Sequence, residues 1–281
     1  MSEKEFKLVC PKCRVHIGHF VNNRFIVDEK CPSCGHKYDN IQNVPNMRMQ
    51  VQKNEKLNLL NDSKTLPNQN SSDSDIPFIQ EALQSDELIL ELGAGVDSCD
   101  NSNLIKTDAY LYSTELHCLA DAHFLPFEDN TFGYVYSLAV FEHLHSPWIA
   151  AEEIRRVLKP GGKVYTLTAF MQHMHGYPHH YFNMTTSGLE RIFQAFEIIS
   201  CEPSKHSSIL QLAYILADLN KIIINSKFSP ESQKEASLLC QNIHEFCQII
   251  PNLDDEIMEN IEMQKLDFSK ISPAIELIAV K

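Results

Sequence analysis

The sequence predicts an α/β protein with a doubly wound, mainly parallel sheet, preceded by a small zinc ribbon. Three observations lead to this fold class. Two Cys-x-x-Cys pairs stand near the start of the chain, short apolar segments alternate with helical ones from residue 77 onward, and an apolar segment returns at the end after a long helical stretch. Strands that alternate with helices are typical of parallel sheets covered by helices on both faces.

The 281 residues divide into five predicted parts, because this length suits one α/β domain and a smaller unit. They are a ribbon (1–55), a linker (56–76), a core (77–205), a helical cap (206–271) and the last core strand (272–281). The linker contains residues 61–75, which are nearly all Asn, Asp, Ser, Gln and Pro. Such a composition buries too little apolar surface to offset the entropy of ordering.

The ribbon is predicted from its cysteines. Seventeen residues separate the pair Cys10 and Cys13 from the pair Cys31 and Cys34, which is the spacing of a zinc site with two thiolates on each side. Residues 19–27 between the pairs read as a hairpin. Four thiolates complete the tetrahedron of the metal, so we expect a structural Zn²⁺ that folds a module too small to fold alone. The other five cysteines are expected to be reduced thiols.

The core elements follow from apolar periodicity. Strands are predicted at 88–92, 104–108, 116–121, 133–138, 163–168 and 196–202, and helices over 77–83, 147–158 and 185–194. Helical periodicity then covers 207–224, 231–250 and, more weakly, 254–263. A strand over 273–281 makes the helices an insertion before the last strand, where a cap could determine substrate specificity.

The formal charge of −13 is unevenly distributed. Residues 1–60 carry a net +4 and the remainder −17. The acidic part after residue 60 should repel the phosphate backbone of a nucleic acid. We therefore expect no nucleic-acid partner except through the ribbon. No signal-peptide core or run of eighteen apolar residues is present in the sequence, so a cytoplasmic protein without a membrane span is expected.

Chemistry is expected at the carboxyl ends of the strands, where ligands of open α/β sheets bind. Gly93 and Gly95 allow the backbone to turn tightly and approach a ligand. Asp108 ends the next strand, where a carboxylate can accept both ribose hydroxyls of a nucleoside. Asp121 ends the third, where it can accept a proton from an adenine amine. Two acids at successive strand ends favour a nucleoside without phosphate.

The run ELGAG, the acid in TD, and the segments DAHFLPFEDNTF, VFEHL and EEIRRVLKPGGKVY resemble the class I S-adenosylmethionine (SAM) dependent methyltransferases. The similarity is to the branch of the ubiquinone and menaquinone biosynthesis enzymes. It covers about residues 78–202 and the last strand. It implies a Rossmann-like sheet of seven strands whose last pair is antiparallel, with SAM lying across the strand-end loops.

The same resemblance implies the residues that bind SAM. Glu91, Gly93 and Gly95 match the glycine loop, and Asp108 the ribose-binding acid. Asp121 with Ala122 matches the adenine-binding pair, and Ser137 with Leu138 the strand end beneath the methionine moiety and substrate. Asp97, with Asp100 and Asn101, follows the glycine loop and could meet the SAM ammonium group.

Catalytic candidates stand after the fourth and fifth strands. His143 lies where such enzymes often meet the acceptor, although a solvent-facing cap residue is the plainer interpretation. The run MQHMHGYPHHYF holds four histidines, and His179, His180 or Tyr177 could assist in removing a proton from an acceptor. A second metal site and a polar loop folded over the pocket are the alternatives for this run.

The ribbon resembles the small zinc-ribbon activator subunit of tRNA and protein methyltransferases, including an apolar-Pro tail at residues 43–45. The resulting hypothesis is SAM-dependent transfer of a methyl group to O or N of a small-molecule or glycan-type acceptor. An RNA methyltransferase that uses the ribbon for substrate binding and a non-catalytic methyltransferase-like scaffold are the alternatives. NAD binding is weaker, because Ser98 replaces the third glycine of its fingerprint.

Overall fold

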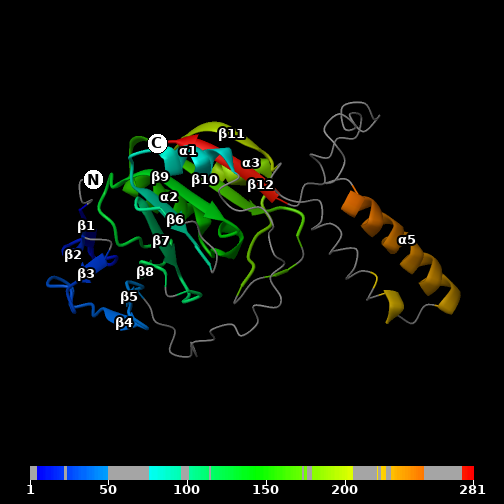
Figure 1. Cartoon of the computed structure of the whole chain (residues 1–281), viewed down its shortest axis with the longest axis horizontal. Coiled ribbons are helices and arrows are strands. Elements are labelled where there is room, and N and C mark those ends of the chain that lie inside the picture. Colours follow the sequence, from blue (N-terminus) through cyan, green and yellow to red (C-terminus); the bar gives the residue numbers. More distant parts are fainter. Residues whose placement is uncertain are drawn as a thin grey trace.

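The computed structural model describes residues 5–21, 24–49, 76–95, 101–113, 115–172, 174–175, 179–204, 220, 223–225, 229–249 and 274–281. Within them a nine-stranded sheet forms the centre of the molecule, with a separate three-stranded sheet at one end (Figure 1). The predicted α/β class with a large, mostly parallel sheet is confirmed.

The large sheet has the strand order β11-β12-β10-β9-β6-β7-β8-β5-β4. The central strands β10, β9, β6, β7, β8 and β5 are parallel, whereas β12 runs antiparallel to both of its neighbours and β4 runs antiparallel to β5. Their bounds are β4 Asp39–Ile41, β5 Val44–Asn46, β6 Ile89–Leu92, β7 Leu104–Asp108, β8 Cys118–Leu119, β9 Phe132–Leu138, β10 Leu158–Ala169, β11 Glu197–Pro203 and β12 Ala274–Val280.

Seven of these nine strands come from the segments in which core strands were predicted. The other two, β4 and β5, come from the N-terminal segment and lengthen the sheet beyond β8. The predicted seven-stranded sheet therefore counted too few strands. The last strand β12 lies between β10 and β11 and is antiparallel to both, as the resemblance implied.

Helices cover both faces of the sheet, and alternate residues along each strand point to opposite faces. On one face α1 (Pro77–Gln84) packs Phe78 and Ile79 against Ile89 of β6. On the other face α2 (Pro147–Val157) and α3 (Thr186–Ile192) pack against the neighbouring Leu90 and the adjacent strands. This is the doubly wound arrangement that the alternation of strands and helices predicted.

Local sequence explains where these helices begin. Both α1 and α2 begin at a proline, whose missing N–H would have no partner in the first helical turn. Thr185 caps α3, because its Oγ1 accepts a hydrogen bond from the Gly188 N–H at 3.1 Å. A short 3₁₀ helix, η2 (Phe141–His143), follows β9 directly.

The N-terminal module is an antiparallel sheet of β1 (Phe6–Val9), β2 (His16–Val21) and β3 (Arg24–Val27). Strands β2 and β3 are the arms of the predicted hairpin. The linker prediction for 56–76 lies almost entirely outside the described residues.

The helical cap is described only in part. Helix α5 (Pro230–Ile249) confirms the helix predicted over 231–250, and Figure 1 shows it away from the sheet. Most of the helix predicted over 207–224 and all of that near 254–263 lie outside the described residues. Among the described helices, none is both long and apolar enough to cross a membrane.

Candidate functional site

The loops after β6, β7, β8 and β9 meet at the carboxyl edge of the parallel strands. Gly93 has a φ of 73°, and a Cβ there would lie 2.4 Å from Cγ2 of Val140, which precedes η2. A glycine is therefore required for the β6 loop to pass the β9 loop this closely. The N–H groups of Gly93 and Ala94 both donate to the Thr107 carbonyl, which holds the glycine loop against β7.

Asp108 ends β7 and is 7% exposed. Its Oδ2 accepts the Gly95 N–H at 3.1 Å, and its Oδ1 accepts the Tyr110 N–H at 2.8 Å. Each carboxylate oxygen can accept a further hydrogen bond. The arrangement fits a carboxylate that accepts hydrogen bonds from two ribose hydroxyls. It also links the glycine loop to the acid that the resemblance assigned to the ribose.

Burial raises the pKa of Asp108 to about 6, although backbone N–H donors and Arg48 favour its ionised form. Arg48 belongs to the N-terminal segment and is itself 7% exposed. It donates to the Ala109 carbonyl at 2.8 Å and to the Asn46 Oδ1 at 2.9 Å. A buried cation from the N-terminal segment thus lies beside the predicted ribose-binding acid.

Asp121 follows β8 by two residues, and its side chain is held by hydrogen bonds from His123. Its Oδ1 accepts both the His123 backbone N–H at 2.9 Å and the Nδ1–H at 2.6 Å. Burial alone would raise the pKa of Asp121, but these hydrogen bonds outweigh burial and leave that pKa lowered. His123 is 4% exposed, accepts the Ser146 N–H through Nε2 and stacks on His145 at 4.2 Å. The acid is therefore ionised and fixed in orientation.

The other predicted SAM-binding residues occupy different environments. Glu91 is buried within β6, and Ser137 donates its hydroxyl to Thr166 Oγ1 of β10 at 2.9 Å. Ser137 therefore directs its hydroxyl into the sheet and could meet a ligand only through its backbone. Leu138 ends β9, and Ala122 follows Asp121. Asp97 and Asp100 lie outside the described residues.

Comparison with known proteins agrees with this geometry. Residues 87–166 match a family model described as "Methyltransferase domain". This segment is similar to a methyltransferase domain, and for that similarity the large sheet with its helices is called the methyltransferase domain below. It contains β6 to β9, the glycine loop, both strand-end acids and most of β10. No curated protein matches the sequence.

Several solved structures are similar at low identity. The [4+2]-cyclase SpnF is 18% identical with a TM-score of 0.41, over 69% of this chain and 74% of that one. Phosphoethanolamine N-methyltransferase 2 of Haemonchus contortus is 16% identical with a TM-score of 0.41, over 73% and 51%. A complex of the Haloferax volcanii Trm112 methyltransferase activator with a methyltransferase is 14% identical with a TM-score of 0.41, over 72% and 87%.

Histidines gather beside the methyltransferase domain's β9 loop. The rings of His143, His175 and His180 lie 4.4 to 5.6 Å apart, centroid to centroid. Nδ1 of His143 bonds the His179 carbonyl at 2.7 Å, which leaves its Nε2 for other partners. The two nitrogens of His180 are both engaged, Nδ1 by the His175 N–H and Nε2 by the Phe182 carbonyl. Tyr177 lies outside the described residues.

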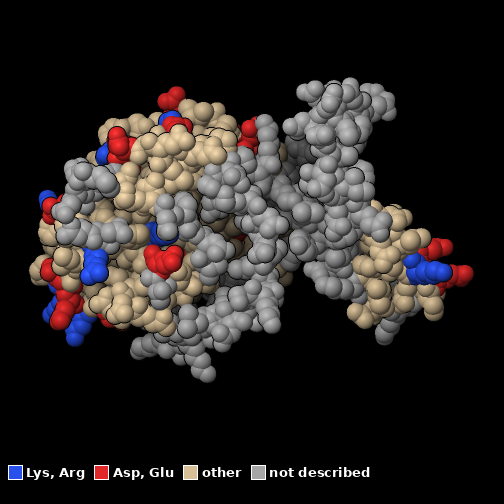
Figure 2. Space-filling view, in the orientation of Figure 1, with Lys and Arg blue, Asp and Glu red and all other residues tan. Residues whose placement is uncertain are grey.

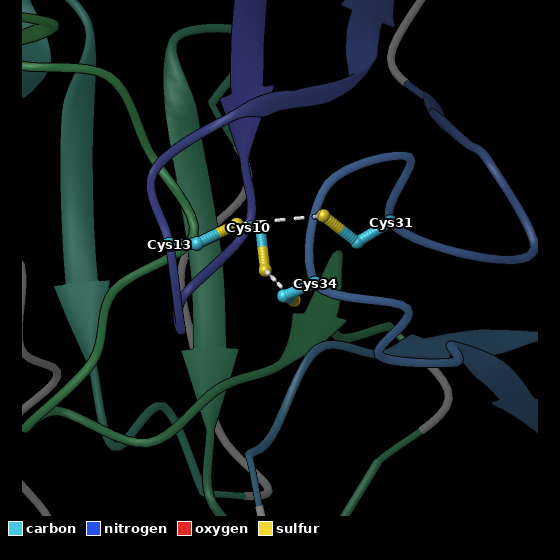
Figure 3. A group of neighbouring side chains, drawn as sticks. All are labelled: Cys10, Cys13, Cys31 and Cys34. Carbon is cyan, nitrogen blue, oxygen red and sulfur yellow. Dashed lines mark hydrogen bonds between the residues drawn. The ribbon is translucent and has the colours of Figure 1, made fainter.

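The four predicted zinc ligands converge (Figure 3). The sulfurs of Cys10 and Cys34 are 3.6 Å apart, and those of Cys13 and Cys31 are 3.5 Å apart. Four sulfurs bound to one zinc at about 2.3 Å lie roughly 3.8 Å apart. The cluster therefore has the dimensions that a tetrahedral zinc requires.

The two cysteine knuckles have the same backbone design. The Cys10 N–H donates to the Val15 carbonyl and the Arg14 N–H returns to the Cys10 carbonyl. Cys31 is bonded in the same way to His36 and Gly35. The Val15 backbone N–H and the neighbouring cysteines lower the pKa of Cys13 to about 6, which favours its thiolate. At Cys34, in contrast, the His36 backbone N–H is outweighed by burial and the same group of cysteines, which raise its pKa to about 11.

The N-terminal module shares its core with the methyltransferase domain. Leu8, Ile17 and Phe20 belong to one hydrophobic cluster with Phe127 and Phe132, and the Val9 N–H donates to the Pro126 carbonyl at 3.0 Å. Arg14 reaches across the junction to the Glu153 Oε1 of α2 at 2.6 Å. The predicted ribbon is therefore packed on the LPF segment of the domain.

Sequence reasoning passed over three residues that the structure brings to the site. Arg48 gave no signal, because a single cation near a predicted linker resembles any surface residue. His123 and Glu142 stood inside segments that had been singled out. Glu142 follows directly after a strand end, and this position could have marked it as a site acid.

Proposed function

We propose that the protein transfers a methyl group from SAM to an oxygen or nitrogen of a small-molecule or glycan-type acceptor. The observation that carries this proposal is the carboxylate of Asp108, hydrogen-bonded to the glycine loop and buried at the end of β7. Within the class we favour the branch that resembles the ubiquinone and menaquinone biosynthesis enzymes, because of the segments DAHFLPFEDNTF and VFEHL.

The residues present fit SAM in two respects. Gly95 has open space where a Cβ would lie, and two fixed carboxylates, Asp108 and Asp121, suit ribose hydroxyls and an adenine amine. When bound, SAM supplies a methyl group on a sulfonium centre, which an acceptor lone pair can attack in line. The domain contributes mainly by fixing the relative orientation of the two reactants.

Proton removal from the acceptor is assigned to the β9 loop. His143 is the best placed of the predicted bases, because its Nδ1 bonds the His179 carbonyl and its Nε2 can accept a proton. His179, His180 and Tyr177 remain candidates for this role. In the structure His180 uses both ring nitrogens to order the loop, so we rank it below His143.

We further propose that Cys10, Cys13, Cys31 and Cys34 hold a structural Zn²⁺, which the sulfur spacing supports. The ribbon then acts as a built-in partner of the domain. RNA methylation through the ribbon receives less support. Figure 2 shows Lys and Arg mixed with Asp and Glu over the N-terminal end of this face, and no continuous basic stripe crosses it.

The first prediction tests the ribose site by calorimetry with SAM and S-adenosylhomocysteine. Asp108→Asn should weaken SAM binding at pH 8 by at least about tenfold, since a carboxylate that accepts hydrogen bonds contributes roughly 1.5–3 kcal/mol. Glu190→Ala, which changes an exposed acid of α3, is the matched control and should bind as the parent does.

Equal affinities for Asp108→Asn and the parent would refute the placement of the ribose. An absence of SAM binding in folded, zinc-replete parent protein would favour the non-catalytic scaffold instead. RNA affinity that falls steeply with added salt would support the RNA methyltransferase alternative.

A further inference from the structure

A cluster of metal-binding side chains lies beside the β9 loop, separate from the four cysteines. Glu142, His143 and His175 each offer one ligand atom, and these atoms all lie within 4.8 Å of one another. The first two belong to η2, and the third belongs to the segment after β10. A carboxylate oxygen and two imidazole nitrogens are the ligand set of several catalytic zinc sites.

Glu142 is the unusual member of the cluster. Its side chain is fully buried, and its Oε1 has no hydrogen-bond partner among the described residues. His175 Nε2 lies 3.9 Å from this oxygen, within the range of an ion pair when the imidazole is protonated but too far for a hydrogen bond. A buried carboxylate oxygen without a hydrogen bond is costly, because it has lost its hydration and a contact at this distance replaces it only in part. A bound cation would remove this cost.

The surrounding hydrogen bonds orient the ligand atoms. Thr168 donates to the other carboxylate oxygen, Oε2, at 2.9 Å, which fixes the direction of Oε1. His143 Nδ1 bonds the His179 carbonyl at 2.7 Å, so its Nε2 can face a metal. Metal-binding histidines usually donate their second ring N–H to a carbonyl or carboxylate in this way.

The backbone holds the two halves of the cluster together. The carbonyl of Glu142 accepts the N–H groups of Tyr181 and Phe182, at 2.8 and 3.2 Å. Nδ1 of His180 accepts the His175 N–H at 3.3 Å. These bonds tie η2 to the segment after β10. Zinc ligands at bond lengths of about 2.1 Å lie roughly 3.4 Å apart, so ligand atoms that lie within 4.8 Å of one another would move closer together when the ion binds.

We propose that Glu142, His143 and His175 form a second metal site, which takes a divalent transition metal such as Zn²⁺ or Co²⁺. Two imidazoles disfavour Mg²⁺ and Ca²⁺, which prefer oxygen ligands alone. Three protein ligands leave an open position on the ion, in contrast to the four cysteines. Val140, which touches the Gly93 position, places the site beside the glycine loop. If the proposed methyl transfer is correct, the open position lies near the acceptor. His143 Nε2 would then bind the ion instead of accepting a proton, and the role of base would pass to the other candidates of the loop.

The experiment uses full-length protein whose cysteine site is first filled with one equivalent of Zn²⁺. Co²⁺ is then titrated and its visible d–d absorption is followed. The parent should bind one further Co²⁺ per chain, without the intense sulfur-to-cobalt charge-transfer band that cysteine ligation gives. His175→Asn and Glu142→Gln should each weaken this binding at least tenfold, whereas Glu152→Gln, an exposed acid of α2, should not.

The histidine variant protects the test against a folding artefact, because His175 is partly exposed whereas Glu142 is buried. Far-UV circular dichroism should show that both variants remain folded. The proposal would be overturned if folded parent protein bound no further Co²⁺. It would also be overturned if the parent and folded His175→Asn bound Co²⁺ with equal affinity. Calorimetry with SAM is independent of this titration, so failure of the metal site and failure of the methyltransferase assignment give different results.

Discussion

At the scale of single residues, Asp108 has the environment that matters most. It is surrounded by backbone donors and by Arg48, yet burial still raises its pKa to about 6. Its ionisation in the free protein is therefore expected within the range of ordinary assay buffers. The identity of this acid could be predicted from the sequence, because it stands at the end of an apolar strand. Its pKa could not, because the partner Arg48 is remote in sequence.

The second prediction is that SAM binding weakens as the pH falls below about 6. In the proposed site the carboxylate accepts ribose hydroxyls, and its protonated form would supply one acceptor fewer. With a raised pKa in the free protein, the competent ionised fraction is nearly complete at pH 8 and about a tenth at pH 5. The dissociation constant for SAM should thus rise about tenfold between these values, as measured by calorimetry.

Asp108→Asn serves as the control, because it has no carboxyl group to titrate at this position. Its weaker SAM affinity should show a flatter pH profile than that of the parent. A parent profile that is flat from pH 8 to pH 5 would contradict the raised pKa or the role of Asp108.

At the scale of secondary structure, predictions were best where an apolar run had clear ends. The strand over 104–108 is observed with those bounds, and the helix over 147–158 ends only one residue earlier. The strand predicted at 116–121 shrinks to Cys118–Leu119. The strand predicted at 163–168 is part of β10, which begins earlier, at Leu158, and its pairing with β9 shifts register between Leu158 and Lys163.

The two strands that the sequence did not predict show which strands a local sequence pattern cannot reveal. β4 and β5 have three residues each, and β5 contains Pro45. Neither has the length or alternation that marks a strand in a sequence. They form because β8 offers a free edge, to which Asn46 pairs and the Met47 N–H donates at 2.8 Å. These two strands therefore depend on pairing with β8, which is remote in the sequence.

The third prediction concerns the segment that follows β5. Arg48→Ala removes a cation that favours the ionised form of Asp108, so the pKa of that acid should rise further. The pH midpoint of SAM binding should move upward by roughly half a unit to one unit. Arg24→Ala, an exposed cation of β3, should leave the midpoint unchanged.

Thermal melting should accompany these titrations, because Arg48 also bonds Asn46 and the Ala109 carbonyl. A lower melting temperature with an unchanged midpoint would assign Arg48 a role in packing alone. A raised midpoint would show that the N-terminal segment influences the cofactor site electrostatically.

At the scale of the whole molecule, the ribbon and the methyltransferase domain form a single structure. One hydrophobic cluster includes Cys10 and Cys31 together with Phe127 and Ile154. Arg156 bonds the Phe127 and Leu125 carbonyls, on the segment against which the ribbon packs. The convergence of the four cysteines could be predicted from their spacing. The place of the N-terminal module on the domain could not, because the contacts depend on side chains far apart in the sequence.

The fourth prediction is that zinc removal destabilises the entire chain. Structural zinc can contribute about 10–16 kcal/mol to the folding of an isolated finger. Because the two parts share a hydrophobic core, part of this lost folding free energy should destabilise the domain as well. A zinc-free protein should therefore melt in one transition, at a temperature lower by about 10 °C or more. Differential scanning calorimetry before and after chelation measures both quantities.

Refilling with Zn²⁺ should restore the melting temperature, and circular dichroism should follow the same transition as calorimetry. Two separate transitions, with the upper one insensitive to chelation, would contradict a shared core. The Glu142 cluster binds independently in our proposal, so His175→Asn should retain the large effect of chelation.

Strand β5 has one more consequence, for the behaviour of the protein in a crowded solution. Without β5, the parallel sheet would end at β8, which consists of two buried residues. The backbone N–H and C=O groups on the outer edge of β8 would then have no strand to pair with. Open edges of this kind invite pairing between molecules. The N-terminal segment closes that edge and presents in its place β4, a short strand whose Asp39 and Asn40 are exposed. The same polypeptide that brings Arg48 to the proposed cofactor site thereby replaces an apolar open edge with a short polar one.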